Sequence, residues 1–213
     1  MNEHIKQQLI TRSLEIIKER KNDPSHDGNH ALQVLKNVQT IAEKEGGDLD
    51  ILIPAALLHD AVIYAKNDPR SDNAPQESAE LTKTVLESLE GYPAEKIPAV
   101  MSVIAGCSFH KTAVPETLEG KILCDADKLE ATGAIAIMRT FSSGGQMGRA
   151  LYHHSDPFAE KRTPNAMEHS LDLFSERLLV AKDRLHTQTA KEIATQRTEV
   201  LHDFLDQLKR ELV

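Results

Sequence analysis

Apolar residues recur every three or four positions through most of the chain, with charged and amide side chains between them. This spacing is typical of amphipathic helices that cover a shared core. Alternating β-branched runs with Asn-Gly turns, which would indicate strands, do not occur in the sequence. The pattern therefore predicts an all-α fold, with helical or densely apolar segments at about 2–20, 30–45, 48–58, 77–89, 97–104, 117–141, 166–181 and 186–211.

Several helix ends can be placed from single residues. The helix that has His30 in its first turn should stop at Gly46-Gly47, because glycine favours the end of a helix. Asp48 is expected to cap the next helix, which runs to the pair His59-Asp60. Pro54 lies inside that run, so we expect either a kink there or a helix that effectively starts near it.

Polar stretches separate the helical segments. Residues 66–75 are polar and contain two prolines, so they should form a loop attached to the end of the His59-Asp60 helix. Ser142-Ser143-Gly144-Gly145 is expected to end the apolar segment before it, and the chain should be irregular up to Pro164. Loops beside rigid helices often carry binding residues, which makes the first loop a candidate part of a site.

Composition and charge narrow the class of protein. The 213 residues, 40% of them hydrophobic, suffice for one domain with a sizeable core. A formal net charge of -8 gives no basic surface for a nucleic-acid polymer, although it leaves a nucleotide possible. The two cysteines, Cys107 and Cys124, fit a reducing compartment. No leader-like start and no uncharged run of about 18 residues occurs, so we expect a cytoplasmic protein with no membrane partner.

Four polar residues stand out because they lie in or at the ends of apolar segments: His30, His59, Asp60 and Asp127. Any one of them alone is more typical of a satisfied polar group than of a ligand. Together, two imidazoles and two carboxylates make a mixed nitrogen and oxygen ligand set for a divalent cation. Such a set leaves coordination positions open for water and substrate, which is the requirement for metal-assisted hydrolysis.

The same residues resemble the pattern of the HD-domain superfamily of metal-dependent phosphohydrolases. The similarity is greatest to small bacterial HD hydrolases, through the motifs His26-Asp27-Gly28-Asn29-His30 and Asp125-Ala126-Asp127-Lys128-Leu129. It continues through Ala65-Lys66-Asn67, Tyr92-Pro93-Ala94-Glu95-Lys96-Ile97, Gly133-Ala134-Ile135, Asp156-Pro157-Phe158 and Arg197-Thr198-Glu199, and so covers nearly the whole chain. The resemblance implies an HD-domain helical bundle with additional C-terminal helices. This would be one domain over residues 1–213, with a core at about 26–140 and a C-terminal extension at about 164–213.

The resemblance also implies a ligand set of His30, His59, Asp60 and Asp127 around one divalent metal ion. Asp125 competes for the last place, and we prefer Asp127 because it directly precedes the basic residue, as the ligand does in related enzymes. Nitrogen and oxygen ligands suit manganese, iron, cobalt, nickel and zinc. Manganese (Mn2+) is our first expectation, and Mg2+, Co2+, Ni2+, Fe2+ and Zn2+ are the alternatives.

Substrate groups follow from position. Lys66 and Arg70 in the loop after the His-Asp helix, and Lys128 beside the last ligand, can each meet phosphate oxygens. His26, one turn before His30, can transfer a proton or hold a leaving phosphate. The expected catalytic residues are therefore Asp60, His26 and Lys128.

Two positions depart from the family pattern. Cys107 stands where relatives often have histidine, and the nearby His110 is a candidate replacement. Val62, Ile63 and Tyr64 follow the His-Asp pair, where deoxynucleoside monophosphatases of the family carry an acidic residue. The second departure weakens the case for a monophosphatase.

The resemblance therefore favours a nucleotide phosphohydrolase that cuts a (deoxy)nucleoside triphosphate to the monophosphate and pyrophosphate, with water activated by the metal as nucleophile. The alternatives are a phosphatase or phosphodiesterase on another small phosphorylated metabolite, or a non-catalytic module that senses a nucleotide or a metal. The expected partner is a small-molecule substrate. The amphipathic pattern at the C-terminus, which includes Ile193, Val200 and Leu208, suits either internal packing or a homodimer.

Overall fold

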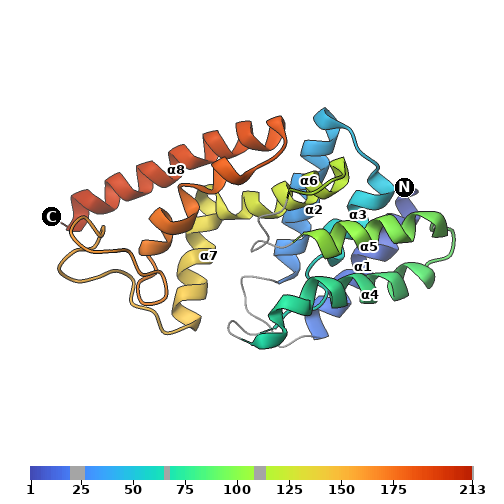
Figure 1. The fold of residues 1–213 in the computed structure, drawn as a ribbon, viewed down its shortest axis with the longest axis horizontal. Helices are drawn as coiled ribbons and strands as arrows, with labels where there is room; N and C mark the ends of the chain where they lie inside the picture. Colours follow the sequence, from blue (N-terminus) through green and yellow to red (C-terminus); the bar gives the residue numbers. More distant parts are fainter. Residues whose placement is uncertain (20–26, 65–67, 108–113, 213) are drawn as a thin grey trace. The chain divides into compact units, whose positions relative to one another are not determined.

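The computed structural model of the protein describes residues 1–19, 27–64, 68–107 and 114–212. These residues are mainly helical and contain no strand, only an isolated bridge between Ala150 and His169, so the all-α prediction is confirmed. The chain forms two compact units, Met1–Asp127 and Lys128–Val213 (Figure 1). The single domain over residues 1–213 stays a prediction. No described helix is both long enough and apolar enough to cross a membrane.

The first unit is built around α3 (Leu49–Leu58), which packs against four other helices. Seven consecutive residues of α3, from Leu52 to Leu58, are buried, as expected of a helix that is apolar on every side. Its neighbours are α1 (Glu3–Glu19), α2 (Gly28–Glu45), α4 (Ala74–Glu87) and α5 (Ile97–Gly106). The remaining α-helix described in this unit is α6 (Leu118–Lys128).

The predicted helix ends around α3 are confirmed. Helix α2 stops at Glu45, and Gly46 follows with a φ of 85°, a conformation that favours glycine. The Asp48 side chain accepts a hydrogen bond of 2.9 Å from the Asp50 N–H and so caps α3. Pro54 lies inside a helix that begins at Leu49, so the expectation of a start near Pro54 is wrong.

A tyrosine compensates for the missing amide of Pro54. In a regular helix the N–H of residue 54 would donate to the carbonyl of Asp50, and proline has no N–H. The Tyr92 hydroxyl donates to this Asp50 oxygen at 2.7 Å instead. Burial and the nearby carboxylates of Asp50 and Asp48 raise the pKa of Tyr92, which keeps its hydroxyl protonated as a donor.

The loop predicted at 66–75 is partly helical in its described portion. A 3-10 helix covers Pro69–Asn73, and α4 already begins at Ala74. The Asp68 side chain accepts from the Arg70 N–H at 2.9 Å and starts the short helix. Both prolines of the stretch occupy first-turn positions, where the absent N–H costs nothing, so they begin helices rather than prevent them.

The second unit has a mainly aliphatic core, which also contains the buried ring of Phe174, and two long helices border it. Helices α7 (Gly133–Gln146) and α8 (Gln188–Leu212) pack against each other. The Phe174 ring lies 6.1 Å from the Phe141 ring and 5.5 Å from the Phe204 ring, measured between centroids. The shorter helical pieces of this unit are Leu129–Ala131, Phe174–Leu178 and Ala181–Arg184.

Two predictions in this unit are wrong. Helix α7 continues past Ser142, and its Gly144 allows a close approach: a Cβ there would lie 2.0 Å from Ser170 Oγ. The long helix expected at 166–181 is replaced by turns, one π-helical turn and one 3-10 helix. The Ser170 N–H donates to the Ala150 carbonyl at 2.9 Å, and the Ala150 N–H donates to the Glu168 carbonyl at 3.0 Å. These bonds use backbone groups that a helix would need.

A buried ion pair also holds this irregular segment. The Asp172 carboxylate, whose side chain is 1% exposed, accepts bonds from both terminal nitrogens of Arg162, the longer at 2.7 Å, and from the Asn165 N–H at 2.7 Å. Burial acts to raise the pKa of Asp172, but the Arg162 and Asn165 bonds outweigh it and hold the pKa below its usual range.

Tyr92→Phe should destabilise the protein by about 1 kcal/mol, because the Asp50 carbonyl loses its donor. In a Pro54→Ala background the same change should cost much less, since the backbone amide restored at position 54 can then donate to Asp50. Urea unfolding of the four proteins in this cycle measures the difference. Tyr152→Phe is the matched control, because no hydrogen bond of its hydroxyl occurs in the described residues. Equal costs in both backgrounds would contradict the compensation.

Asp172→Asn should lower the free energy of unfolding by about 2–3 kcal/mol at pH 7. The folded pKa of Asp172 is depressed, so its contribution is present above the unfolded value near 3.9 and is lost as the pH falls through the folded value. The difference between wild type and variant should therefore shrink below about pH 4. Urea titrations at pH 7, 5 and 3 test this, with exposed Asp203→Asn as the control. A difference that does not change with pH would refute it.

Candidate metal site

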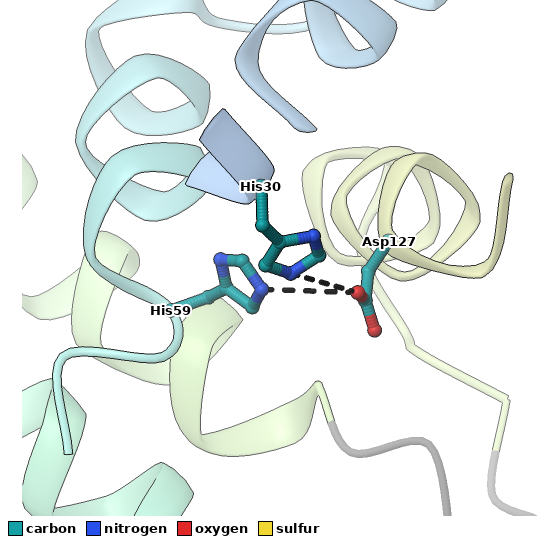
Figure 2. Close-up of side chains that lie close together, drawn as sticks. All are labelled: His30, His59 and Asp127. Carbon is teal, nitrogen blue, oxygen red and sulfur yellow. Dashed lines mark ion pairs between the residues drawn. The ribbon is translucent and has the colours of Figure 1, made fainter. Parts of the chain in front are cut away.

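Three side chains from three helix ends converge in the first unit (Figure 2). Ligand atoms of His30, His59 and Asp127 all lie within 4.8 Å of one another. The Asp127 Oδ1 atom is 3.5 Å from His30 Nε2 and 3.8 Å from His59 Nε2. A cation held about 2.0–2.2 Å from each ligand would place the ligand atoms roughly 3–3.5 Å apart, close to these separations.

His30 is presented by the first turn of α2. The Asp27 side chain caps this helix, accepting from the Asn29 N–H at 2.9 Å and from the His30 N–H at 3.1 Å. Gly28 lies against α1, and a Cβ there would come 2.7 Å from Leu14 Cδ2. The cap and this close packing fix the turn from which the His30 ring enters the site.

His59 follows the last residue of α3, and its own helix sets its tautomer. The Nδ1 atom lies 2.9 Å from the Ala56 carbonyl oxygen, which can only accept, so Nδ1 carries the proton. In the neutral ring the Nε2 atom is therefore left with a lone pair. It is buried and has no hydrogen-bond partner among the described residues. A metal ion would satisfy such a nitrogen.

Asp60 borders the same group from the turn after α3. Its Oδ2 atom lies 3.7 Å from His30 Nε2 and 3.6 Å from His59 Nε2. Ser78, fully buried in α4, holds this turn, since its hydroxyl accepts from the Val62 N–H at 2.9 Å and donates to the Val62 carbonyl at 3.3 Å. The Asp60 side chain is 37% exposed, against 3% for His30 and 6% for His59, so the carboxylate forms the open side of the group.

Asp127, in the last turn of α6, and Asp125 have different surroundings. The Asp127 side chain is 23% exposed and belongs to the converging group. Asp125 is fully buried and is not a member of it. The difference follows from helix geometry, because residues two apart point about 200° apart around the axis.

The donor set suits a divalent cation. Two carboxylates face two buried imidazole rings, and a doubly charged ion would neutralise both carboxylates. His59 sits at the C-terminal end of α3, where the helix dipole also favours a cation. His30, His59 and Asp127 can thus hold a metal ion, with Asp60 beside them.

Of the other predicted site residues, the structure describes Arg70 and Lys128. Arg70 pairs with Asp68 through two bonds, of 3.1 and 2.7 Å, and its guanidinium carbon lies 4.4 Å from the centre of the Tyr64 ring. This pairing lowers the pKa of Asp68 to about 2. Lys128 Nζ lies 3.5 Å from His186 Nε2. The remaining candidates lie outside the described residues, namely His26, Lys66 and His110.

Comparison with known proteins shows the family. The model of the HD domain matches residues 27–132, which include all four candidate ligands. The uncharacterized Bacillus subtilis protein YpgQ is 30% identical over 191 residues, covering 88% of this chain and 84% of YpgQ. The chain belongs to the HD-domain superfamily.

Solved structures agree with this assignment. An HD-superfamily hydrolase from Bacillus thuringiensis is 32% identical and superposes with a TM-score of 0.70, each chain covered to 97%. YpgQ of Bacillus subtilis in complex with ADP is 29% identical, with a TM-score of 0.72 and 97% of each chain covered. The protein therefore has the fold of the HD-superfamily hydrolases, a family of metal-dependent enzymes.

Two residues that support the HD site are not evident from the ligand pattern in the sequence. The His26–His30 motif contains Asp27 without giving it a role, although an acidic residue directly before a helix is a typical N-cap. Ser78 has no local signal, because its hydrogen-bond partner, Val62, is 16 residues away and belongs to another element. Only the tertiary structure brings Ser78 to Val62, whereas the Asp27 cap is local.

Manganese should raise the melting temperature of the wild-type protein. A ligand at 100 times its Kd adds about 2.7 kcal/mol, or roughly 5 °C or more for a chain of this size. Asp127→Asn should abolish the increase, whereas Asp125→Asn should keep it even if the metal-free protein melts lower. Differential scanning calorimetry with EDTA and with manganese chloride measures both. An increase that depends on Asp125 instead would assign the ligand differently.

Proposed function

We propose that this HD-domain protein is a metal-dependent phosphohydrolase that converts a (deoxy)nucleoside triphosphate to the monophosphate and pyrophosphate. The observation that carries the proposal is the convergence of His30, His59 and Asp127, with Asp60 on the exposed side. A site with all its ligands buried would suit a structural metal. Here one flank is open, as a metal that acts on a substrate requires.

The similarity to YpgQ supports a nucleotide as the substrate. YpgQ has been solved in complex with ADP, and the similarity covers almost the whole of both chains. The two proteins therefore share both the helical unit with the ligands and the C-terminal unit. We extend nucleotide binding to this protein on that basis.

In this proposal His30, His59, Asp60 and Asp127 hold one divalent ion, with manganese preferred. When bound, the ion would lower the pKa of a coordinated water and polarise a phosphoryl oxygen. The Nδ1 proton of His59 stays on the bond to the Ala56 carbonyl throughout, so Nε2 keeps a constant role as an electron-pair donor. Asp60 binds the metal ion. Because it is partly exposed, it also orients the attacking water.

Cationic side chains complete the proposed site. Arg70 is ordered before substrate arrives, because Asp68 and the Tyr64 ring hold its guanidinium group. A triphosphate would compete with Asp68 for the same nitrogens, in the paired geometry that Arg offers to phosphate. Lys66 and Lys128 are proposed to neutralise further phosphate oxygens, and His26 to transfer a proton to the leaving group.

Deoxynucleoside and nucleoside triphosphates should be hydrolysed with manganese present, and each turnover should release one pyrophosphate. Chromatography of the nucleotide product together with a pyrophosphatase-coupled phosphate assay distinguishes pyrophosphate from orthophosphate. Asp60→Ala should lower kcat/KM by at least about a hundredfold. Exposed Asp203→Asn should leave it unchanged and serves as the control. Orthophosphate as the first product would indicate a phosphatase, and metal binding without turnover would indicate a sensing module.

A further inference from the structure

A buried amide links the helix of His30 to the helix of Asp127. Asn37 is 3% exposed, and its Nδ2 group donates to the Ala126 carbonyl oxygen at 3.1 Å. Ala126 directly precedes Asp127 in α6. Asn37 follows His30 by seven residues, nearly two helical turns, so both lie on one face of α2.

The Ala126 carbonyl is a suitable acceptor because of its place in the helix. Carbonyls of the last helical turn no longer have a regular amide partner four residues ahead, and side-chain donors commonly satisfy them. A buried amide is costly without such a bond. A hydrogen bond also has a preferred distance and direction, so this one sets where α6 ends relative to α2, which apolar contact alone would not do.

A second polar bond fixes the same face of α6 at its other end. Glu119 Oε1 accepts from the Asp48 N–H at 3.0 Å, and Asp48 is the N-cap of α3, the helix that leads to His59. Glu119 precedes Ala126 by seven residues and so lies on the same side of α6. Gly47 suits this close packing, since a Cβ there would lie only 3.2 Å from Ile122 Cδ1.

We propose that Asn37 is a positioning residue for the metal site. It does not belong to the ligand group, and it acts by holding Asp127 at the separation from His30 and His59 that the metal requires. The role rests on the proposed metal site but not on any particular substrate. Losing the bond should therefore weaken metal binding by about tenfold, the effect typical of residues that orient a ligand.

The test uses manganese alone. Asn37→Leu keeps the approximate shape of the side chain and removes the donor, so its Kd for manganese should rise about tenfold in calorimetric titrations. Electron paramagnetic resonance of unbound manganese gives an independent measurement of the same constant. If Asn37→Leu does not fold, Asn37→Ser, whose hydroxyl is too short to span the same distance, replaces it and should give the same result.

The control separates positioning from general loss of stability. Val38→Ala removes apolar contacts of a fully buried neighbour on the same helix. It should lower the melting temperature of the metal-free protein while leaving the manganese Kd unchanged. A folded Asn37 variant with the wild-type Kd would overturn the positioning role while the metal site stands. No binding of manganese by the wild type would overturn the metal site itself, and the proposal with it.

Discussion

The burial of two imidazole rings beside two carboxylates is the constraint on which the first unit depends. The side chains of His30 and His59 are 3% and 6% exposed, and ring nitrogens so far from water need partners. His59 satisfies one nitrogen with the carbonyl of its own helix. The Nε2 atom of each ring faces Asp60 and Asp127. Helices α2, α3 and α6 must therefore all meet at one point, whatever else packs around them.

Helix α3 makes such a meeting possible because it is apolar on every side. Its neighbours enclose it, so its C-terminal end can hardly shift without disturbing the core. The Pro54 interruption does not loosen it, since Tyr92 supplies the hydrogen bond that proline cannot. The His59-Asp60 pair is thus carried at the end of a rigid element, as an accurately placed site needs.

A small number of polar side chains then sets the register of the surrounding elements. Ser78 fixes the turn after Asp60, Asn37 fixes the end of α6, and Glu119 fixes its start. Apolar contacts supply most of the stabilisation but have no preferred direction, whereas these bonds do. The separation of the candidate ligands reflects both contributions. The ligand group is open on the Asp60 side, which suits a metal used for hydrolysis better than a purely structural metal.

Local rules in the sequence already determined much of this protein. Apolar spacing predicted α1, α5 and α8, glycine and aspartate marked the boundary between α2 and α3, and the four candidate ligands could be named from their setting. The helices and their boundaries depend on residues within a turn or two of each other. Tertiary structure alone decided that His30, His59 and Asp127, which are far apart in sequence, lie together, and that residues 166–181 are not one long helix. Both outcomes depend on hydrogen bonds between groups distant in sequence. Asn37 bonds Ala126 in α6, and Ala150 bonds Glu168 and Ser170, where these bonds outweigh the local preference for a helix.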